Sequence, residues 1–286
     1  MTRQRSQPDT TSGSAPQDDR RFVTALARGL AVLRCFKPQD RWLAHQEIAR
    51  RSGLPQATVS RLTFTLTCLG YLRHRSPRGE YALAPGVLAL GFAMLQNFDV
   101  GRIARPHMQA LADHAQAAVS LGVRHELSMV YVAHCRSSAR LVLGLDVGAR
   151  LPLASTAMGR ALLCALQPAE RARLMQQVLA GLQPGVVGAP LTSTTADAAA
   201  LQDGLARALA QHAATGFVTS ESEWEPEITA AGAPVDLGDG REPLSLTVGG
   251  ASARLNGSWL HEDLGPALVR TVRAITADLQ AAQWDA

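Results

Sequence analysis

The first third of the chain spaces its apolar residues at the three- and four-residue steps of amphipathic helices. These steps place Leu26, Leu30 and Leu33 on one face of a predicted helix over Thr24–Phe36. Pro38 is expected to end this helix, because a proline disfavours helical backbone in the residue before it. The ordered part of the chain is therefore expected to begin with a helix that needs a packing partner.

Two short helices joined at a glycine are predicted next. The first covers about His45–Ser52, Gly53 suits the positive φ of a turn, and Pro55 suits the start of the second helix. Ala49 is small where the two helices must cross. The inward stripe of the second helix is expected to be Val59, Leu62, Leu66 and Leu69. Such a pair is a helix-turn-helix.

The opposite face of the second helix is polar near its N-terminus. A face of this kind can lie in the major groove of DNA with its first residues at the base edges. Arg61 is able to bond guanine and Gln56 adenine, whereas a hydroxyl reaches a base or a phosphate. The predicted DNA-facing residues are Gln56, Ala57, Thr58, Ser60 and Arg61. The alternative is an ordinary helical hairpin with exposed polar residues.

A β-hairpin is predicted directly after the second helix. Strands over Leu72–Arg75 and Glu80–Leu83 flank a turn at 76–79, where proline and glycine supply the turn chemistry. Its basic residues are Arg73, His74, Arg75 and Arg78. A basic ribbon beside a recognition helix contacts phosphates or the minor groove. The whole order predicts a winged helix-turn-helix domain over residues 21–84.

Residues 85–100 form a strongly apolar connector. A helix is expected from Ala84 to about Phe98, with apolar residues on more than one face, so it must be buried. Packing within its own chain is one possibility. Dimerisation is favoured, because helix-turn-helix domains commonly read two half-sites with two-fold symmetry.

The remainder, residues 101–286, reads as an α+β domain. The predicted helices cover about 101–118, 168–179, 197–215 and 261–280, and the predicted strands cover 119–124, 128–135, 140–145, 217–220, 231–237 and 244–249. The short connections suit hairpins, so the pairing is expected to be antiparallel. Six or so antiparallel strands with helices packed against them form the layout of a small-molecule sensor.

One further helix is expected to start at Ser155 or Thr156, both good N-caps. The free N–H groups of a helix start attract anions. The small residues Ala154, Ala157 and Gly159 would let a ligand approach the backbone. A carboxylate ligand fits this chemistry, and a plain N-cap with close packing is the alternative.

An alternation of acidic residues follows the strand predicted at 217–220. Its members are Glu221, Glu223, Glu225 and Glu227. Four carboxylates at period two would face one side of an extended segment and could hold a cation or an amine. Pro226 and the expected mobility favour a solvated loop instead.

Charge separates the two halves of the chain. The 286 residues suffice for two domains, and 47% of them are hydrophobic. Residues 1–105 hold 16 Lys+Arg and 7 Asp+Glu, a net charge of +9, whereas residues 106–286 hold 12 and 17, a net charge of −5. This asymmetry favours a polyanionic partner for the first third alone.

Composition also narrows the setting. No apolar run approaches the roughly 20 residues that span a bilayer, and the polar residues 1–20, expected to be a disordered tail, lack the apolar core of a secretory signal. We expect a cytoplasmic protein without a membrane partner. The widely spaced cysteines Cys35, Cys68, Cys135 and Cys164 are expected to be small buried thiols. No metal site and no cofactor is expected.

In this combined order the chain resembles the IclR family of bacterial transcriptional regulators. The stretches that carry the resemblance are Ala25–Leu33, Gly53–Val59, Leu69–Tyr71, Leu151–Leu163 and Leu246–Gly250. The resemblance implies a winged helix-turn-helix with a GAF-like effector-binding domain, and dimers that often pair into tetramers. It also implies a double-stranded DNA operator, commonly of a catabolic operon, and a small organic or aromatic acid as effector.

The resemblance also assigns an effector pocket. Its residues are Leu143, Leu151, Ala157, Met158, Ser220, Ile228, Ala230, Thr247 and Gly249, and the helix start adds Ser155 and Thr156. Two departures lie close by: Glu225–Ile228 replaces a stretch that usually contains glycine, and Gly249 replaces a common serine. The apolar members indicate a ligand with a hydrophobic or aromatic body.

Two other classes of protein were compared with this interpretation. An enzyme is disfavoured, because the sequence has no G-x-S-x-G, H-E-x-x-H, Walker or G-x-G-x-x-G motif, and His134 is expected to be a core residue. A DNA-binding protein without a ligand would use its C-terminal half only to oligomerise. An effector at 100 times its dissociation constant should stabilise the chain by about 2.7 kcal/mol, which separates a ligand-responsive regulator from a DNA-binding protein without a ligand.

Overall fold

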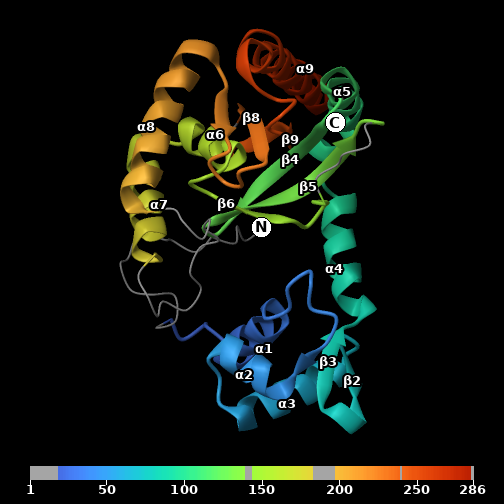
Figure 1. Cartoon of the computed structure of the whole chain (residues 1–286). Helices are drawn as coiled ribbons and strands as arrows, with labels where there is room; N and C mark the ends of the chain where they lie inside the picture. The colour runs from blue at the N-terminus through green and yellow to red at the C-terminus, as the bar shows by residue number, and fades with distance from the viewer. Residues whose placement is uncertain (1–18, 139–143, 183–196, 239, 285–286) are drawn as a thin grey trace, which may run out of the picture. The chain divides into compact units, whose positions relative to one another are not determined.

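The computed structural model describes residues 19–138, 144–182, 197–238 and 240–284 (Figure 1). The chain divides into two compact units, Met1–Met94 and Leu95–Ala286. The division falls within the segment predicted as a linker. Of the predicted tail, only residues 19 and 20 are among those described.

The N-terminal unit contains three helices and a small antiparallel sheet. Its elements are α1 (Thr24–Arg34), β1 (Leu43–Ala44), α2 (His45–Ser52), α3 (Gln56–Cys68), β2 (Leu72–Arg75), a 3-10 turn (Ser76–Arg78) and β3 (Glu80–Leu83). The sheet order is β1-β3-β2. The predicted helix-turn-helix and hairpin are confirmed, and Gly53 takes the positive φ of 67° that the turn requires. The short strand β1 was not predicted, because two residues carry no alternation.

A small core holds this unit together. Its buried members are Val32, Cys35, Leu43, Ile48, Val59, Leu66 and Leu72. The predicted inward stripes were partly wrong, because Leu26, Leu30 and Leu69 are 63%, 47% and 62% exposed. Leu69 follows Val59 by ten residues, which places it about 80° around the helix from Val59, and it lies at the C-cap where the helix ends. Thr63, four residues after Val59, is buried instead, and its hydroxyl donates to the Val59 carbonyl at 2.9 Å.

The connector helix is α4 (Pro85–Gln96), and none of its residues is buried. Leu88, Leu90, Phe92 and Met94 are among its exposed side chains. The helix still touches its own chain at both ends, since the Gly86 N–H donates to the Gly70 carbonyl at 3.3 Å and Leu95 packs against the core of the C-terminal unit. The expectation that it is buried is not met in the single chain.

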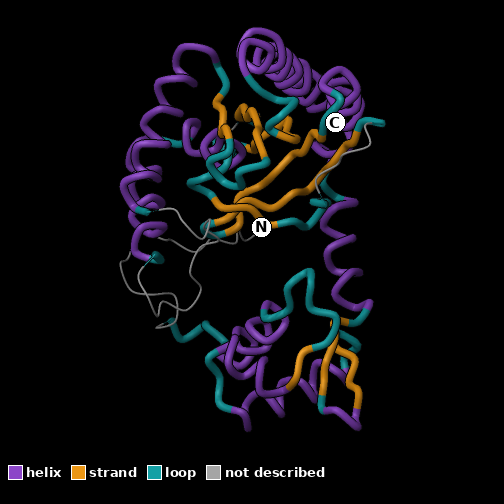
Figure 2. The backbone as a smooth tube through the Cα atoms, in the orientation of Figure 1, coloured by secondary structure: helices purple, strands orange, loops and turns teal. Residues whose placement is uncertain are grey.

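The C-terminal unit is built on a six-stranded antiparallel sheet (Figures 1 and 2). The strand order is β6-β5-β4-β9-β8-β7. The strands are β4 (Ala118–His125), β5 (Ser128–Arg136), β6 (Arg150–Pro152), β7 (Val218–Glu221), β8 (Ile228–Val235) and β9 (Leu244–Ala251). The helices are α5 (Asp99–Ala115), α6 (Ala157–Ala165), α7 (Pro168–Ala180), α8 (Ala198–Thr215) and α9 (Gly265–Trp284), the last preceded by a π-type turn, Trp259–Leu264. The predicted α+β sensor layout is confirmed.

Helices cover both faces of this sheet. One face packs against α5 and α9 through a core that includes Met108, Leu121, Leu246 and Leu268. The other face packs against α6, with α7 and α8 beside it, through Met129, Met158 and Leu162. Strand alternation explains the difference between the faces, because large apolar residues such as Leu121 and Leu246 alternate with small or polar ones. The α6 face therefore has room for a cavity.

One predicted strand falls mostly outside the described residues. Of the strand expected over Arg140–Leu145, residues 140–143 are not described, and Gly144 and Leu145 are not in a strand. The sixth strand is β6, in a stretch that was expected to be a loop. Its three residues pair with β5, Leu151 opposite Met129. A strand this short gives no periodicity to recognise.

Two expectations from composition are also tested. No described helix is both long and apolar enough to cross a membrane.

All four cysteines are free, but Cys68 is exposed and Cys164 only half-buried, so the expectation of four buried thiols was wrong for these two. Cys68 ends α3 on its outer side, where the core does not reach.

Candidate nucleic-acid interface and small-molecule pocket

The polar face of α3 is open to solvent. Gln56, Ala57, Ser60 and Arg61 are exposed, and Thr58 is half-buried. Pro55 precedes the helix with extended backbone, φ −58° and ψ 142°, so the first turn of α3 stands free at its N-terminus. No other described residue forms an ion pair or hydrogen bond with the Arg61 guanidinium, which is thus available to a partner molecule.

The hairpin presents its arginines unequally. Arg78 is exposed at the tip, and the guanidinium carbon of Arg73 lies 5.7 Å from the ring centroid of Trp42. Arg75 lies 4.7 Å from the same ring and forms an ion pair with Glu80, with 3.1 Å between Arg75 Nε and Glu80 Oε2. Cation–π contacts of this kind hold an arginine side chain in place. Arg73 and Arg78 are therefore free to meet phosphates, whereas the charge of Arg75 is already matched within the chain.

An ion-pair cluster fixes α2 beside the recognition helix. Arg51 bonds Asp40, and its Nε lies 2.6 Å from Glu47 Oε1. A further bond from Arg51 Nη1 to the Cys35 carbonyl, 2.9 Å, connects α2 to the end of α1. Hydrogen bonds from Arg50, and then from Arg51, lower the pKa of Glu47 to about 2. The cluster ties α2 to the end of α1 and to Asp40.

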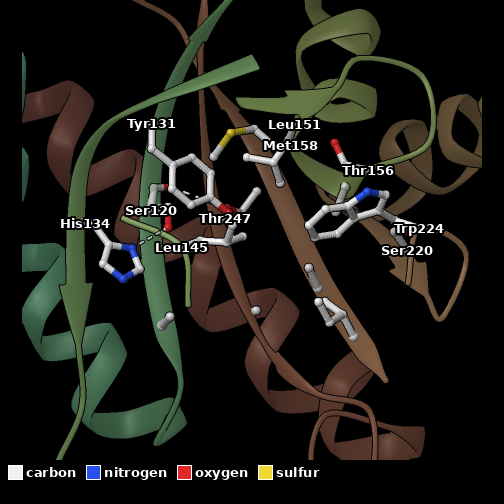
Figure 3. A pocket seen from close by; sticks show the side chains of 15 residues that line it. Ser120, Tyr131, His134, Leu145, Leu151, Thr156, Met158, Ser220, Trp224 and Thr247 are labelled. Atoms are coloured by element: carbon white, nitrogen blue, oxygen red, sulfur yellow. Dashed lines mark hydrogen bonds between the residues drawn. The ribbon is translucent and has the colours of Figure 1, made fainter. Parts of the chain in front are cut away.

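A small cavity opens on the α6 face of the large sheet (Figure 3). Nine of the eleven predicted effector residues line it: Leu151, Thr156, Ala157, Met158, Ser220, Ile228, Ala230, Thr247 and Gly249. Ser155 is buried but does not line the cavity, and Leu143 lies outside the described residues. The free space inside the cavity is only about 30 Å³, enough for about two water molecules, so an effector would have to displace side chains of the wall.

Sequence reasoning missed six of the residues that line the cavity. They are Ala118, Ser120, Tyr131, His134, Leu145 and Trp224. Strand register brings several of them together, since Ser120 of β4 lies opposite both Thr247 of β9 and His134 of β5. The alternation of small and polar residues in β4 and β9 was a usable signal. The register itself was not readable from the sequence.

One end of the cavity is polar but uncharged. Arg136 Nε donates to His134 Nε2 at 3.0 Å, so that nitrogen carries no proton. The proton is therefore on Nδ1, which donates to Ser120 Oγ at 2.8 Å. Burial, and then the charge of Arg136, hold the pKa of His134 below its ordinary value. The Ser120 hydroxyl hydrogen can then be donated to the Tyr131 hydroxyl.

Tyr131 completes this polar end. Its ring stacks on His134 with centroids 5.9 Å apart. Burial raises the pKa of the Tyr131 hydroxyl, against the opposing effect of hydrogen bonds with Ser120 and Thr247. His134 is buried, as expected of a core residue, yet it also faces the cavity (Figure 3).

The start of α6 forms another part of the wall. Thr156 caps it as predicted: its hydroxyl accepts from the Gly159 N–H at 3.2 Å and donates to the Pro152 carbonyl at 2.8 Å. Gly122 makes room for the neighbouring Met158, because a Cβ there would lie 2.2 Å from the Met158 sulfur. The cavity thus meets a helix N-terminus at one side and apolar side chains around it.

The chain matches two family models. The IclR helix-turn-helix domain matches residues 25–76, and the bacterial transcriptional regulator IclR C-terminal model matches residues 92–277. The chain belongs to the IclR family. It is accordingly a DNA-binding transcriptional regulator with an effector domain, and not an enzyme.

Full-length relatives agree with this family. The HTH-type transcriptional regulator TsaQ1/TsaQ2 of Comamonas testosteroni is 33% identical over 92% of this chain and 90% of its own. The crystal structure of an IclR family transcriptional regulator from Brucella abortus is 38% identical, with a TM-score of 0.81 over 93% of this chain and 96% of that chain.

A more distant IclR homologue, from Microbacterium hydrocarbonoxydans, was solved in complex with 4-hydroxybenzoate. It is 22% identical and covers 90% of this chain and 99% of that chain, with a TM-score of 0.67. At this identity the likeness to the IclR-family regulator described here is one of fold alone.

The acidic run of this IclR-family regulator is largely a loop whose four glutamates are exposed, as expected, but two of them are paired within the chain. Glu223 accepts from Arg160 at 2.8 Å and from Arg207 at 2.9 Å, and Glu221 lies 3.1 Å from His261. No cluster of three or more metal-ligating side chains was found among the described residues. The usable signal was Arg160, a single arginine on an otherwise apolar helix, since a buried guanidinium needs a carboxylate.

Proposed function

We propose that this regulator binds a duplex DNA operator through α3 and the hairpin β2–β3, and that a small organic acid with an aromatic body acts as its effector. The DNA controls a catabolic operon, and the effector occupies the cavity on the α6 face. The observation that carries the proposal is this cavity, which gathers nine predicted residues around one polar and one apolar region.

The DNA-binding half rests on the free face of α3. Gln56, Ser60 and Arg61 are exposed at the start of this helix, where a recognition helix meets base edges. Arg61 has no described partner and is the residue we assign to guanine. Arg73 and Arg78 of the hairpin supply phosphate contacts, as the positive charge of the first third of the chain favours.

The effector half rests on the two ends of the cavity. The start of α6 offers backbone N–H groups to a carboxylate, with Ala157 and Met158 at the cavity wall. At the opposite end of the cavity, the Ser120 hydroxyl offers hydrogen bonding to a polar group of the effector. An aromatic ring between them would contact Trp224 and Tyr131. 4-Hydroxybenzoate, the ligand of the Microbacterium hydrocarbonoxydans homologue, has a carboxylate and a hydroxyl at opposite ends of a ring and is the first probe to test.

The active species is proposed to be a homodimer or a dimer of dimers. A groove of about 690 Å³ in the N-terminal unit is lined by Leu26, Leu30, Leu69 and Leu90, and its lining also includes Thr58 and Arg61, so a second copy seated there would lie beside the DNA-facing residues. Exposed apolar surface of this extent marks an interaction site. A second copy suits it, because two-fold symmetric operators require paired recognition helices. Sedimentation of the purified protein tests this arrangement, and a monomer at micromolar concentration would count against it.

The central experiment joins both halves. Genomic fragments retained by the protein at low salt are sequenced, and the recovered operator is titrated with and without a panel of aromatic and aliphatic acids, 4-hydroxybenzoate included. We expect at least one aromatic acid to bind by calorimetry and to change operator affinity. No selective retention of any fragment would overturn the DNA half. Binding of aliphatic acids alone would overturn the effector half.

A further inference from the structure

A buried arginine lies directly behind the cavity wall. Arg160, on the first turns of α6, is 2% exposed. Its Nε donates to the Ala154 carbonyl at 3.0 Å, and its Nη2 donates to Glu223 Oε2 at 2.8 Å. A buried guanidinium is stable only when its donors are matched in this way. One side chain therefore connects two segments 69 residues apart in the sequence.

A third element closes on the same guanidinium. Gly204 of α8 packs so tightly against it that a Cβ at this position would lie 2.1 Å from Arg160 Nη2. From the same helix, Arg207 donates to Glu223 Oε2 at 2.9 Å. Burial by itself raises the pKa of Glu223, but the hydrogen bond from Arg160 and the charges of Arg160 and Arg207 outweigh it. The pKa of Glu223 is therefore lowered, and its carboxylate is ionised at neutral pH.

Both segments held by Arg160 continue directly into the cavity wall. Ala154 is two residues before Thr156, which lines the cavity and caps α6. Glu223 is followed by Trp224, whose ring is half-buried and faces the cavity (Figure 3). In the same view Trp224 lies beside Thr156 and Ser220. The spacing of these two walls thus depends on what holds Ala154 and Glu223.

We infer that Arg160 is a positioning residue of the effector pocket, which uses Glu223 to hold Trp224 as a fixed aromatic wall beside the start of α6. A planar effector then meets a preformed stacking surface. Binding therefore does not have to order the wall, and this raises the affinity. The role of the wall in binding rests on the function proposed above. The ordering of Trp224 by Arg160 does not, and it is measurable without any effector.

The two bonds to Glu223 contribute unequally. The Arg160 side chain is 3% exposed, whereas that of Arg207 is 64% exposed. An exposed ion pair is screened and weak, and removal of one partner of a buried pair leaves an unmatched charge. Substitution of Arg207 by Gln should therefore disturb Trp224 far less than substitution of Glu223.

The first test substitutes Glu223→Gln and compares it with Glu225→Gln, an exposed carboxylate two residues later. The fluorescence of Trp224 is isolated by subtracting the spectrum of the matching Trp224→Phe protein. We expect acrylamide quenching of Trp224 to rise by about twofold in Glu223→Gln, because the released segment opens to solvent. It should stay at the wild-type value in Glu225→Gln. Equal quenching in the two variants would overturn the inference.

The second test moves the guanidinium without changing any charge. Gly204→Ala places a methyl group where Arg160 Nη2 lies, and alanine favours helix over glycine, so α8 itself should not be weakened. We expect Trp224 to become more accessible to acrylamide than in the wild type, as in Glu223→Gln. Far-UV circular dichroism checks that each variant is folded. A folded Gly204→Ala protein with wild-type quenching would contradict the role given to Arg160.

A ligand arm adds the functional consequence. If 4-hydroxybenzoate binds the wild type, Glu223→Gln should weaken its affinity by about tenfold, the equivalent of 1.4 kcal/mol, and Glu225→Gln should leave it unchanged. Equal affinities in wild type and Glu223→Gln would overturn the positioning role in binding. Absence of binding to the wild type would count against the proposed effector class only, since the quenching results decide the ordering of Trp224 by themselves.

Discussion

The two units present their chemistry in opposite ways. The N-terminal unit displays the candidate DNA-reading residues on one exposed helical turn and a half, within Gln56–Arg61. The C-terminal unit builds its cavity from residues between Ala118 and Gly249, brought together by the six strands of the sheet, the start of α6 and two loops. A surface site therefore follows from local pattern, whereas an interior site depends on register and on contacts between segments distant in sequence.

The hydrophobic cores of the two units also differ, in their number and size. The N-terminal unit has a single cluster of seven buried apolar residues. The C-terminal unit has two large clusters, one on each face of its sheet. A lost methyl group removes a larger share of the packing in the small core. Each unit should therefore respond to substitutions in its own way.

The largest effect is expected from Ile48→Ala. Ile48 is 0% exposed in the helix-turn-helix, and truncation of such a residue costs about 2–5 kcal/mol. This loss should unfold much of the N-terminal unit and abolish operator binding, while the C-terminal unit keeps its calorimetric transition. Leu26→Ala, at a position 63% exposed, is the control for stability. Retained operator binding by Ile48→Ala at 37 °C would contradict the picture of a small, sensitive core.

The second prediction concerns the surface site. Arg61→Ala should weaken specific operator binding by about 1–3 kcal/mol and leave binding to unrelated DNA nearly unchanged, as expected for a base contact. Arg75→Ala is a matched comparison, because Arg75 is already paired with Glu80 and stacked on Trp42. It should cost less. If Arg61→Ala weakens both kinds of DNA equally, Arg61 contacts a phosphate and does not read a base.

The sequence was most informative where structure is local. The bounds of α2 and of both hairpin strands agree with prediction, because Gly53 and Gly79 take positive φ at the turns, 67° and 60°. It was less informative about which side of a helix faces inward, as Leu69 shows. Thr63 is buried because its hydroxyl bonds within the helix, which a pattern of apolar residues does not reveal.

In the C-terminal unit, residue types gave the cavity only in part. The family resemblance supplied Leu151, Met158 and Thr247, all of which line it. Trp224 lies in the acidic run that was expected to be a solvated loop, so its place in the wall was missed. What fixes it is the pairing of Glu223 with Arg160, 63 residues earlier, and no local pattern reports such a contact.

The third prediction tests the polar end of the cavity. Ser120→Ala removes the hydroxyl that accepts from His134 Nδ1 and that bonds the Tyr131 hydroxyl. If 4-hydroxybenzoate is bound, its affinity should fall by about 0.5–1.5 kcal/mol, the usual value of one neutral hydrogen bond. Operator affinity without effector should not change, since the site lies in the other unit. A larger loss of DNA binding than of ligand binding would mean that the two units are not separable in function.

The smallest effect is expected from a fall in pH. It should lower the melting transition of the N-terminal unit, where a carboxylate has a strongly lowered pKa. Hydrogen bonds from Arg50 and Arg51 lower the pKa of Glu47 to about 2 in the folded N-terminal unit, against 4.5 ordinarily. A carboxyl whose pKa is lowered on folding stabilises the fold fully above its unfolded value, and this contribution is lost as the pH falls toward the folded value. Calorimetry between about pH 6 and about pH 3 should therefore show the transition of the N-terminal unit falling below pH 4.5. Operator DNA identifies that transition, because a ligand raises the melting temperature of the unit that binds it. The effect is small, since exposed pairs are screened by solvent and salt.

Glu47→Gln should lower the melting temperature of this transition at neutral pH and flatten its pH dependence. An equally steep fall in Glu47→Gln would assign the acid sensitivity to other carboxylates, Asp40 first among them, whose pKa is lowered by the same Arg51.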